Sequence, residues 1–168
     1  MPTASEIELK FSIDDPADIG RKLRELGFSS DGQVFERNVV FDSPDGGLRS
    51  NGKLLRLRSD RKVKLTWKET PEDTDPDSRY KVKRESELEI GDFETMRYIF
   101  HRMGYTSERI YEKYREHFVR EDGVAAELDR LPHIGDYLEL EAPPEEIESV
   151  AAALGLDTAE GRRENYFT

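Results

Sequence analysis

The stretch Glu6-Ile7-Glu8-Leu9-Lys10, close to the amino terminus, alternates ionic with apolar residues. On a β-strand the side chains point alternately to the two faces, so Glu6, Glu8 and Lys10 share one face. The stretch therefore predicts a strand over residues 6–13 with one apolar face. Such a strand usually turns its polar face toward water, and taken alone it leaves open whether these carboxylates face solvent or a binding site.

The composition of the chain is that of an acidic, folded domain. Of its 168 residues, 35% are hydrophobic and 38% are charged, the formal net charge is −11, and there is no cysteine. This length predicts a single domain spanning residues 1–168, and the negative charge argues against a general nucleic-acid binder. No apolar run approaches the ~20 residues of a membrane span, and no signal-peptide pattern opens the chain. We therefore expect a cytoplasmic protein with neither nucleic-acid nor membrane partners.

Hydrophobic periodicity and turn residues divide the chain into many strands and a few helices. Strands are predicted at residues 6–13, 34–42, 53–59, 62–68, 79–90, 110–120, 124–129 and 137–141. Helices are predicted to begin at Asp14-Asp15-Pro16, with Asp as the cap and Pro16 in the first turn, at Asp92, which caps the second helix, and at Pro143-Pro144. About eight strands with short connections favour an α+β fold in which an eight-stranded antiparallel sheet curls into a β-barrel.

Two details of local structure can be predicted further. In the helix that begins at Asp92, the spacing of Met96, Ile99, Phe100 and Met103 predicts that these four side chains face the core. Residues 43–47 form a strong turn cluster, because they contain a proline, an aspartate and two glycines. The second strand is therefore expected to end in a turn.

Carboxylates alternate on later strands as they do on the first. Glu127 and Asp129 share one strand face, and Glu139 and Glu141 share another. Mg²⁺ is usually held by one or two carboxylates together with substrate phosphates and water. One such pair is common on a solvent-facing strand, but three pairs in one small domain favour a divalent-metal site.

Basic residues follow the same alternation. The sets are Arg56 with Arg58, Lys62 with Lys64 and Lys68, Lys81 with Lys83, and Lys113 with Arg115. Like charges side by side cost free energy unless something neutralises them. A polyphosphate would do so, because arginine binds phosphate oxygens bidentately and lysine supplies a point charge. Cross-strand salt bridges with the carboxylates are the alternative, which stays open for each single residue.

Other chemistries lack a pattern in this chain. There is no glycine-rich loop that would hold phosphate at the start of a helix, and no nucleophile elbow. Histidines 101, 117 and 133 do not have the spacing of metal ligands. Phosphate binding would therefore have to come from side chains, and no general base can be named.

In their order along the chain, these motifs resemble the CYTH family, the triphosphate tunnel metalloenzymes. Glu6, Glu8 and Lys10 match the family hallmark Glu-x-Glu-x-Lys. Lys83 stands where the family has arginine in its Arg-x-Glu-x-Glu element, while Arg84 lies one position out of register. The other matching segments are Phe41-Asp42-Ser43-Pro44-Asp45, Leu55-Arg56-Leu57-Arg58, Leu65-Thr66-Trp67-Lys68, Lys113-Tyr114-Arg115, Leu128-Asp129 and Ile134-Gly135-Asp136-Tyr137-Leu138-Glu139-Leu140-Glu141.

The resemblance implies an eight-stranded antiparallel β-tunnel that binds a triphosphate together with Mg²⁺ or Mn²⁺. The implied metal-side carboxylates are Glu6, Glu8, Asp129, Glu139 and Glu141. The implied phosphate-binding residues are Lys10, Arg56, Arg58, Lys68, Lys83, Lys113 and Arg115.

The resemblance favours a class IV adenylyl cyclase, which converts ATP to cyclic AMP and pyrophosphate. A triphosphatase acting on inorganic triphosphate or thiamine triphosphate is the alternative reaction. A non-catalytic module that binds polyphosphate or a nucleotide is a third reading, and a homodimer is a further expectation.

Overall fold

The computed structural model describes residues 3–164, which form eight strands and four α-helices. The strands are β1 (Thr3–Ile13), β2 (Ser29–Asp42), β3 (Lys53–Ser59), β4 (Val63–Glu69), β5 (Lys81–Ile90), β6 (Ser107–Val119), β7 (Ala125–Leu131) and β8 (Gly135–Glu141). The helices are α1 (Pro16–Glu25), α2 (Gly47–Ser50), α3 (Phe93–Arg102) and α4 (Pro144–Leu154), followed by a 3₁₀ turn, η1 (Thr158–Glu160). Within residues 3–164, no helix combines the length and the hydropathy that a membrane span requires.

The strands are hydrogen-bonded in the order β1-β5-β4-β3-β2-β6-β7-β8, and this order closes because β8 pairs with β1. The pairing of β1 with β8 is antiparallel and sets Glu8 opposite Glu141 and Lys10 opposite Glu139. All eight predicted strands are present, with ends that shift by a few residues. The prediction of an α+β fold built on an eight-stranded antiparallel barrel is confirmed.

The chain divides into two compact units. Within residues 3–164, unit 1 comprises residues 3–5, Phe35–Thr74 and Lys83–Glu112, and unit 2 comprises Glu6–Val34, Asp75–Val82 and residues 113–164. Strands β1, β2, β5 and β6 contribute residues to both units. Each unit has an apolar core of its own.

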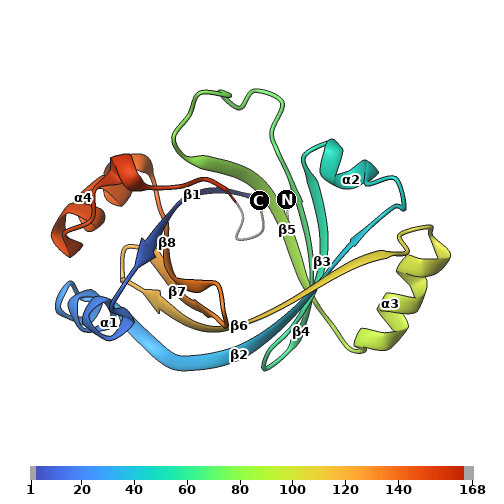
Figure 1. Ribbon diagram of the computed structural model, residues 1–168, viewed down its shortest axis with the longest axis horizontal. Coiled ribbons are helices and arrows are strands. Elements are labelled where there is room, and N and C mark those ends of the chain that lie inside the picture. The colour runs from blue at the N-terminus through green and yellow to red at the C-terminus, as the bar shows by residue number, and fades with distance from the viewer. Residues whose placement is uncertain (1–2, 165–168) are drawn as a thin grey trace. The chain divides into compact units, whose positions relative to one another are not determined.

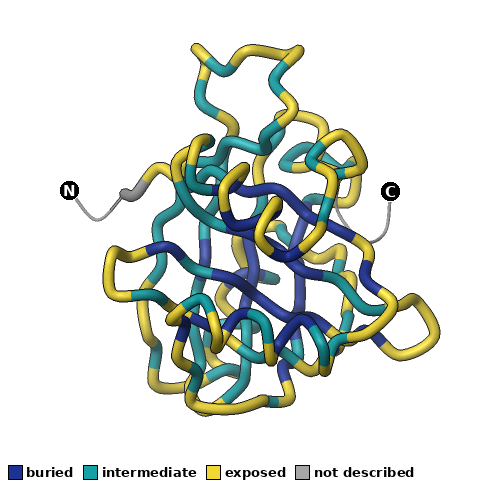
Figure 2. The backbone as a smooth tube through the Cα atoms, turned by 90° about the vertical axis from the view of Figure 1, so that its left-hand side faces the viewer, coloured by how far each residue is buried: buried dark blue, intermediate teal, exposed yellow. Residues whose placement is uncertain are grey.

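The core of unit 2 is formed by apolar side chains of β1, β6, β7 and β8 and of helices α1 and α4. The two helices lie side by side (Figure 1). Helix α1 begins at Pro16 because the Asp15 side chain accepts a hydrogen bond from the Asp18 N–H at 3.0 Å. The side chains of Leu9 and Phe11 on β1 are buried in this core. Figure 2 shows buried segments along the strands and exposed ones at the turns. Because Leu9 and Phe11 take one face of β1, Glu8 and Lys10 face the other way.

The core of unit 1 forms where α3 packs on the strands. Phe100 is 6% exposed, and its ring packs against the Phe41 ring in a T-shaped arrangement with a centroid distance of 5.1 Å. The prediction that Ile99 and Met103 face this core is wrong, since they are 41% and 64% exposed. Phe93, Met96 and Phe100 have the spacing i, i+3, i+7 and form the face of the helix that packs against the core. Ile99 and Met103 lie outside this face.

Candidate functional site

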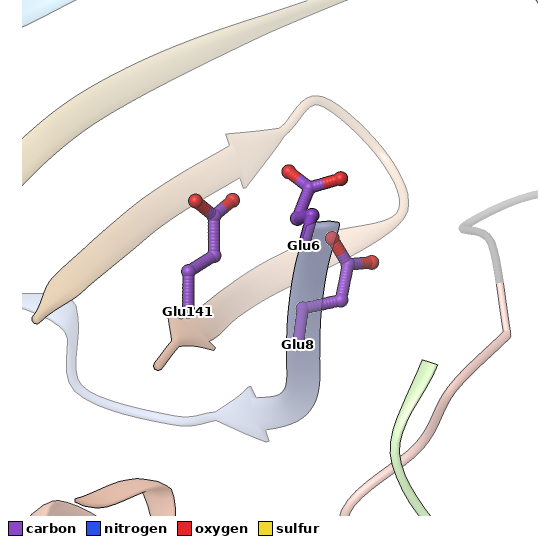
Figure 3. Close-up of side chains that lie close together, drawn as sticks. All are labelled: Glu6, Glu8 and Glu141. Carbon is purple, nitrogen blue, oxygen red and sulfur yellow. The ribbon is translucent and has the colours of Figure 1, made fainter. Parts of the chain in front are cut away.

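Three carboxylates converge in unit 2. Glu6 and Glu8 lie on β1, and Glu141 lies on the neighbouring strand β8 directly opposite Glu8. One oxygen from each of the three side chains lies within 4.8 Å of the others, and the three extend from their strands to the same side (Figure 3). An all-oxygen donor set of this kind suits a hard divalent cation.

The electrostatics of this carboxylate cluster are unfavourable without a cation. Burial, followed by the neighbouring charges of Glu6 and Glu127, raises the pKa of Glu141 to about 9. A divalent ion among the three side chains would favour the ionised form of each. The donor set and its excess of negative charge therefore fit a metal ion.

The other two predicted metal-side carboxylates, Asp129 and Glu139, pair with cations. Asp129 accepts hydrogen bonds from Lys113 Nζ at 2.8 Å and from Arg115 Nε at 2.6 Å. Glu139 lies 3.0 Å from Lys10 Nζ and 2.9 Å from Arg115 Nη2. Burial opposes ionisation of Glu139, but Lys10 and Arg115 outweigh it and hold its pKa well below the usual range. These two carboxylates thus fix three of the predicted phosphate-binding side chains.

In unit 1, the two predicted arginines have different surroundings. Arg56 is 8% exposed and donates to the Tyr111 hydroxyl and to Thr66 Oγ1, both at 3.4 Å. Its Nε is buried and has no hydrogen-bond partner within residues 3–164. Arg58 lies 3.1 Å from Glu87 and 3.7 Å from Glu36, so it takes part in cross-strand ion pairs.

The two predicted lysines of unit 1 also have partners within the unit. Lys68 Nζ lies 2.5 Å from Glu85 on the paired strand β5. Lys83 Nζ donates to Thr70 Oγ1 at 2.6 Å and to the Gly52 carbonyl at 3.2 Å. Cross-strand pairing, the alternative raised by the sequence, therefore occurs at Lys68 as it does at Arg58.

Two side chains that contact the predicted site are absent from the residues that the family resemblance implies, although the sequence groups one of them, Lys81, with Lys83 in a basic set. Lys81 Nζ lies 2.5 Å from Glu8 Oε1, and Tyr111 contacts Arg56. The alternation of residues along a strand could have identified both, because Lys81 lies two residues before Lys83 and Tyr111 lies two residues before Lys113. The alternation marks the face of the strand, but it does not reveal which side chain across the sheet each residue will meet.

Comparison with known proteins identifies a family, a related sequence and solved structures that are similar to this chain. A model of the CYTH domain matches residues 4–160. A candidate adenylate cyclase of Methanocaldococcus jannaschii is 32% identical over 137 residues, which are 81% of this chain and 75% of that protein. A solved structure of a Pyrococcus horikoshii protein is 31% identical, with a TM-score of 0.76 and coverage of 96% of both chains.

A structure from Vibrio parahaemolyticus shares the fold at 19% identity, with a TM-score of 0.80 over 96% of this chain and 94% of that one. The family match covers nearly the whole chain and includes β1 and β8, which carry the three converging carboxylates. This protein therefore belongs to the CYTH family, whose members depend on a metal.

Proposed function

We propose that this protein is a metal-dependent enzyme that converts ATP to cyclic AMP and pyrophosphate. The observation that carries the proposal is the convergence of Glu6, Glu8 and Glu141 within 4.8 Å in a member of the CYTH family. The choice of reaction follows the relative from Methanocaldococcus jannaschii, a candidate adenylate cyclase that is 32% identical.

In this proposal, Glu6, Glu8 and Glu141 hold Mg²⁺ or Mn²⁺, which when bound neutralises charge on the phosphate oxygens. The ribose 3′-oxygen bonds to the α-phosphorus and releases its proton to solvent water. The bond from that phosphorus to the β-bridging oxygen breaks, and pyrophosphate leaves with the electron pair. The chain's own task is to position these groups and to absorb the developing charge.

Lys10, Lys113 and Arg115 are the proposed phosphate contacts of unit 2. Each is held by Asp129 or Glu139, so their positive groups are already oriented before a ligand arrives. We also propose that Asp129 and Glu139 contribute to metal binding, as the family resemblance implies. Through their ion pairs they have the additional role of orienting the three basic side chains.

For unit 1, we propose that Arg56, Arg58, Lys68 and Lys83 bind phosphate oxygens. The buried Nε of Arg56 supports this role, because it lacks a hydrogen-bond partner in the described part of the chain. Buried donors are rarely left unsatisfied, and a phosphate oxygen would satisfy this one.

The test is to incubate the purified protein with Mg²⁺ or Mn²⁺ and, in turn, with ATP, inorganic triphosphate and thiamine triphosphate. Cyclic AMP and pyrophosphate in equal amounts are the expected products from ATP. Release of orthophosphate with no cyclic product would contradict the cyclase and identify a triphosphatase. Metal-dependent binding without turnover of any of the three would indicate a binding module.

A further inference from the structure

Lys81 places an ammonium group directly against the carboxylate cluster. Its Nζ lies 2.5 Å from Glu8 Oε1, and the two side chains are only 18% and 6% exposed. Glu8 is one of the three residues whose oxygens converge, so Lys81 and a metal ion would share the same carboxylate.

The backbone that leads into Lys81 is anchored. The Tyr80 hydroxyl donates to Glu148 Oε1 on α4 at 2.8 Å. Arg163 donates to the carbonyl oxygens of Pro76 and Ser78 at 2.7 and 2.8 Å. The segment that leads into β5 is therefore anchored at Pro76, Ser78 and Tyr80, and we expect a rearrangement at Lys81 to involve its side chain.

A divalent cation and an ammonium group repel each other, and the repulsion is strong where both are shielded from water. When a cation binds Glu8, the ammonium of Lys81 must therefore withdraw. A metal bound alone takes Glu8 away from this ammonium, and the nearby Glu139, whose pKa Lys81 also lowers, is already paired with Lys10 and Arg115. A metal that arrives with a polyphosphate brings oxygen atoms that can accept hydrogen bonds from the ammonium of Lys81.

We propose that Lys81 is a positioning residue that occupies Glu8 in the metal-free protein and moves to the phosphate chain when metal and triphosphate bind together. It thereby weakens the binding of metal alone and strengthens the binding of metal with triphosphate. The result is a positive coupling between the two ligands. The inference rests on the proposed metal site, and it holds for a cyclase and for a triphosphatase alike.

The test uses Lys81→Met, which keeps most of the length of the side chain and removes its charge. Isothermal titration of the metal-free protein with Mn²⁺ alone should show a Kd about tenfold lower than in the wild type, a reasonable size for the loss of one nearby charge. The KM for the Mn²⁺–ATP complex should instead rise by about tenfold, because the triphosphate loses a cation. Opposite changes in these two constants cannot come from a damaged fold. Lys81→Arg, which keeps the charge, should restore both constants toward the wild type.

Lys62→Met is the matched control. Lys62 forms an ion pair with Glu89 at 2.7 Å, but both side chains are more than half exposed, at 59% and 56%. Its loss should leave both constants unchanged. Mn²⁺ binding that is unchanged or weaker in Lys81→Met would overturn the inference.

A wild-type protein that binds no Mn²⁺ would overturn both the metal site and the role of Lys81. A wild-type protein that binds Mn²⁺ but forms no cyclic AMP would overturn the proposed reaction alone. In that case, the change in Mn²⁺ affinity of Lys81→Met still decides the role of Lys81.

Discussion

At the scale of the residue, Glu141 should make the stability of the metal-free protein depend on pH. Its folded-state pKa is raised from 4.5 to about 9, first by burial and then by Glu6. A carboxyl group with a raised pKa stabilises the fold fully below its unfolded pKa, and this contribution is lost as the pH rises toward about 9. Metal-free protein should therefore lose stability across this window, and bound metal should reverse the loss.

Glu141→Gln should remove this loss of stability at high pH, because an amide does not ionise. At pH 8, the metal-free variant should be more stable than the wild type by about 1–3 kcal/mol, because folding of the wild type requires Glu141 to take up a proton at this pH and the amide of the variant requires none. Chemical denaturation in the presence of a chelator measures the difference. The gain should vanish near pH 4, and added Mn²⁺ should no longer stabilise the variant. Equal stabilities at pH 8 would contradict the electrostatic account of the cluster.

Arg58 tests the phosphate-binding role in unit 1. Arg58→Ala should raise the KM for the triphosphate by about tenfold, as expected for the loss of one charged contact. Steady-state kinetics measure KM, and thermal denaturation follows the fold, since Glu36 and Glu87 lose an ion-pair partner. A fall in stability with an unchanged KM would mean that Arg58 serves these ion pairs only. Arg58→Lys, which keeps the charge, separates the loss of charge from the loss of bidentate geometry.

At the scale of the element, α3 shows that the spacing of apolar residues is not sufficient to predict which of them are buried. Four apolar residues were predicted to face the core, yet Ile99 and Met103 are exposed while Phe100 is buried. Arg97 and His101, on the same helix, bond to Glu108 on β6 and add a polar constraint to its orientation. The spacing of apolar residues identifies a broad apolar surface of the helix, and the strands that pack against the helix decide which part of this surface is buried.

Point substitutions in α3 test this assignment. Phe100→Ala should destabilise the protein by about 3–5 kcal/mol, because it leaves a cavity against Phe41. Met103→Ala should change stability by less than about 0.5 kcal/mol, since its side chain is mostly in solvent. Urea denaturation measures both variants. Similar losses from the two would mean that Met103 is buried in solution.

Helix α2 was missed because its signals are those of a turn. The cluster at residues 43–47 does end β2, but Asp42 then accepts hydrogen bonds from the N–H groups of Leu48 and Arg49 at 2.8 and 3.1 Å. These bonds satisfy donors that a short helix leaves open at its start. A capping carboxylate five residues before the helix cannot be recognised from local spacing alone.

At the scale of the whole molecule, turnover should depend on Glu8. Glu8→Gln keeps the size of the side chain but removes one of the charges that would hold the metal. It should reduce metal-dependent turnover by at least about a hundredfold while the far-ultraviolet circular dichroism stays unchanged, in line with other lost electrostatic contacts in active sites. Glu25→Gln, at an exposed position, is the control and should retain wild-type turnover. Wild-type turnover in Glu8→Gln would remove Glu8 from the proposed metal site.

The sequence by itself determined the strands, the caps of α1 and α3, and the face on which each ionic residue lies. These features depend on neighbours two to four residues apart, so alternation and capping residues are enough to predict them. The shared face of Glu6, Glu8 and Lys10 is of this kind. The common direction of Arg56 and Arg58 is another.

Only the tertiary structure decided which of these residues meet. Glu141 joins Glu6 and Glu8, whereas Asp129 and Glu139 pair with Lys113, Arg115 and Lys10. Lys81 reaches Glu8, 73 residues earlier in the chain. Such contacts depend on strand order and register, which are set by the packing of distant apolar faces and not by local spacing. Alternation therefore predicted a polar face, and register decided which carboxylates and which cations meet on it.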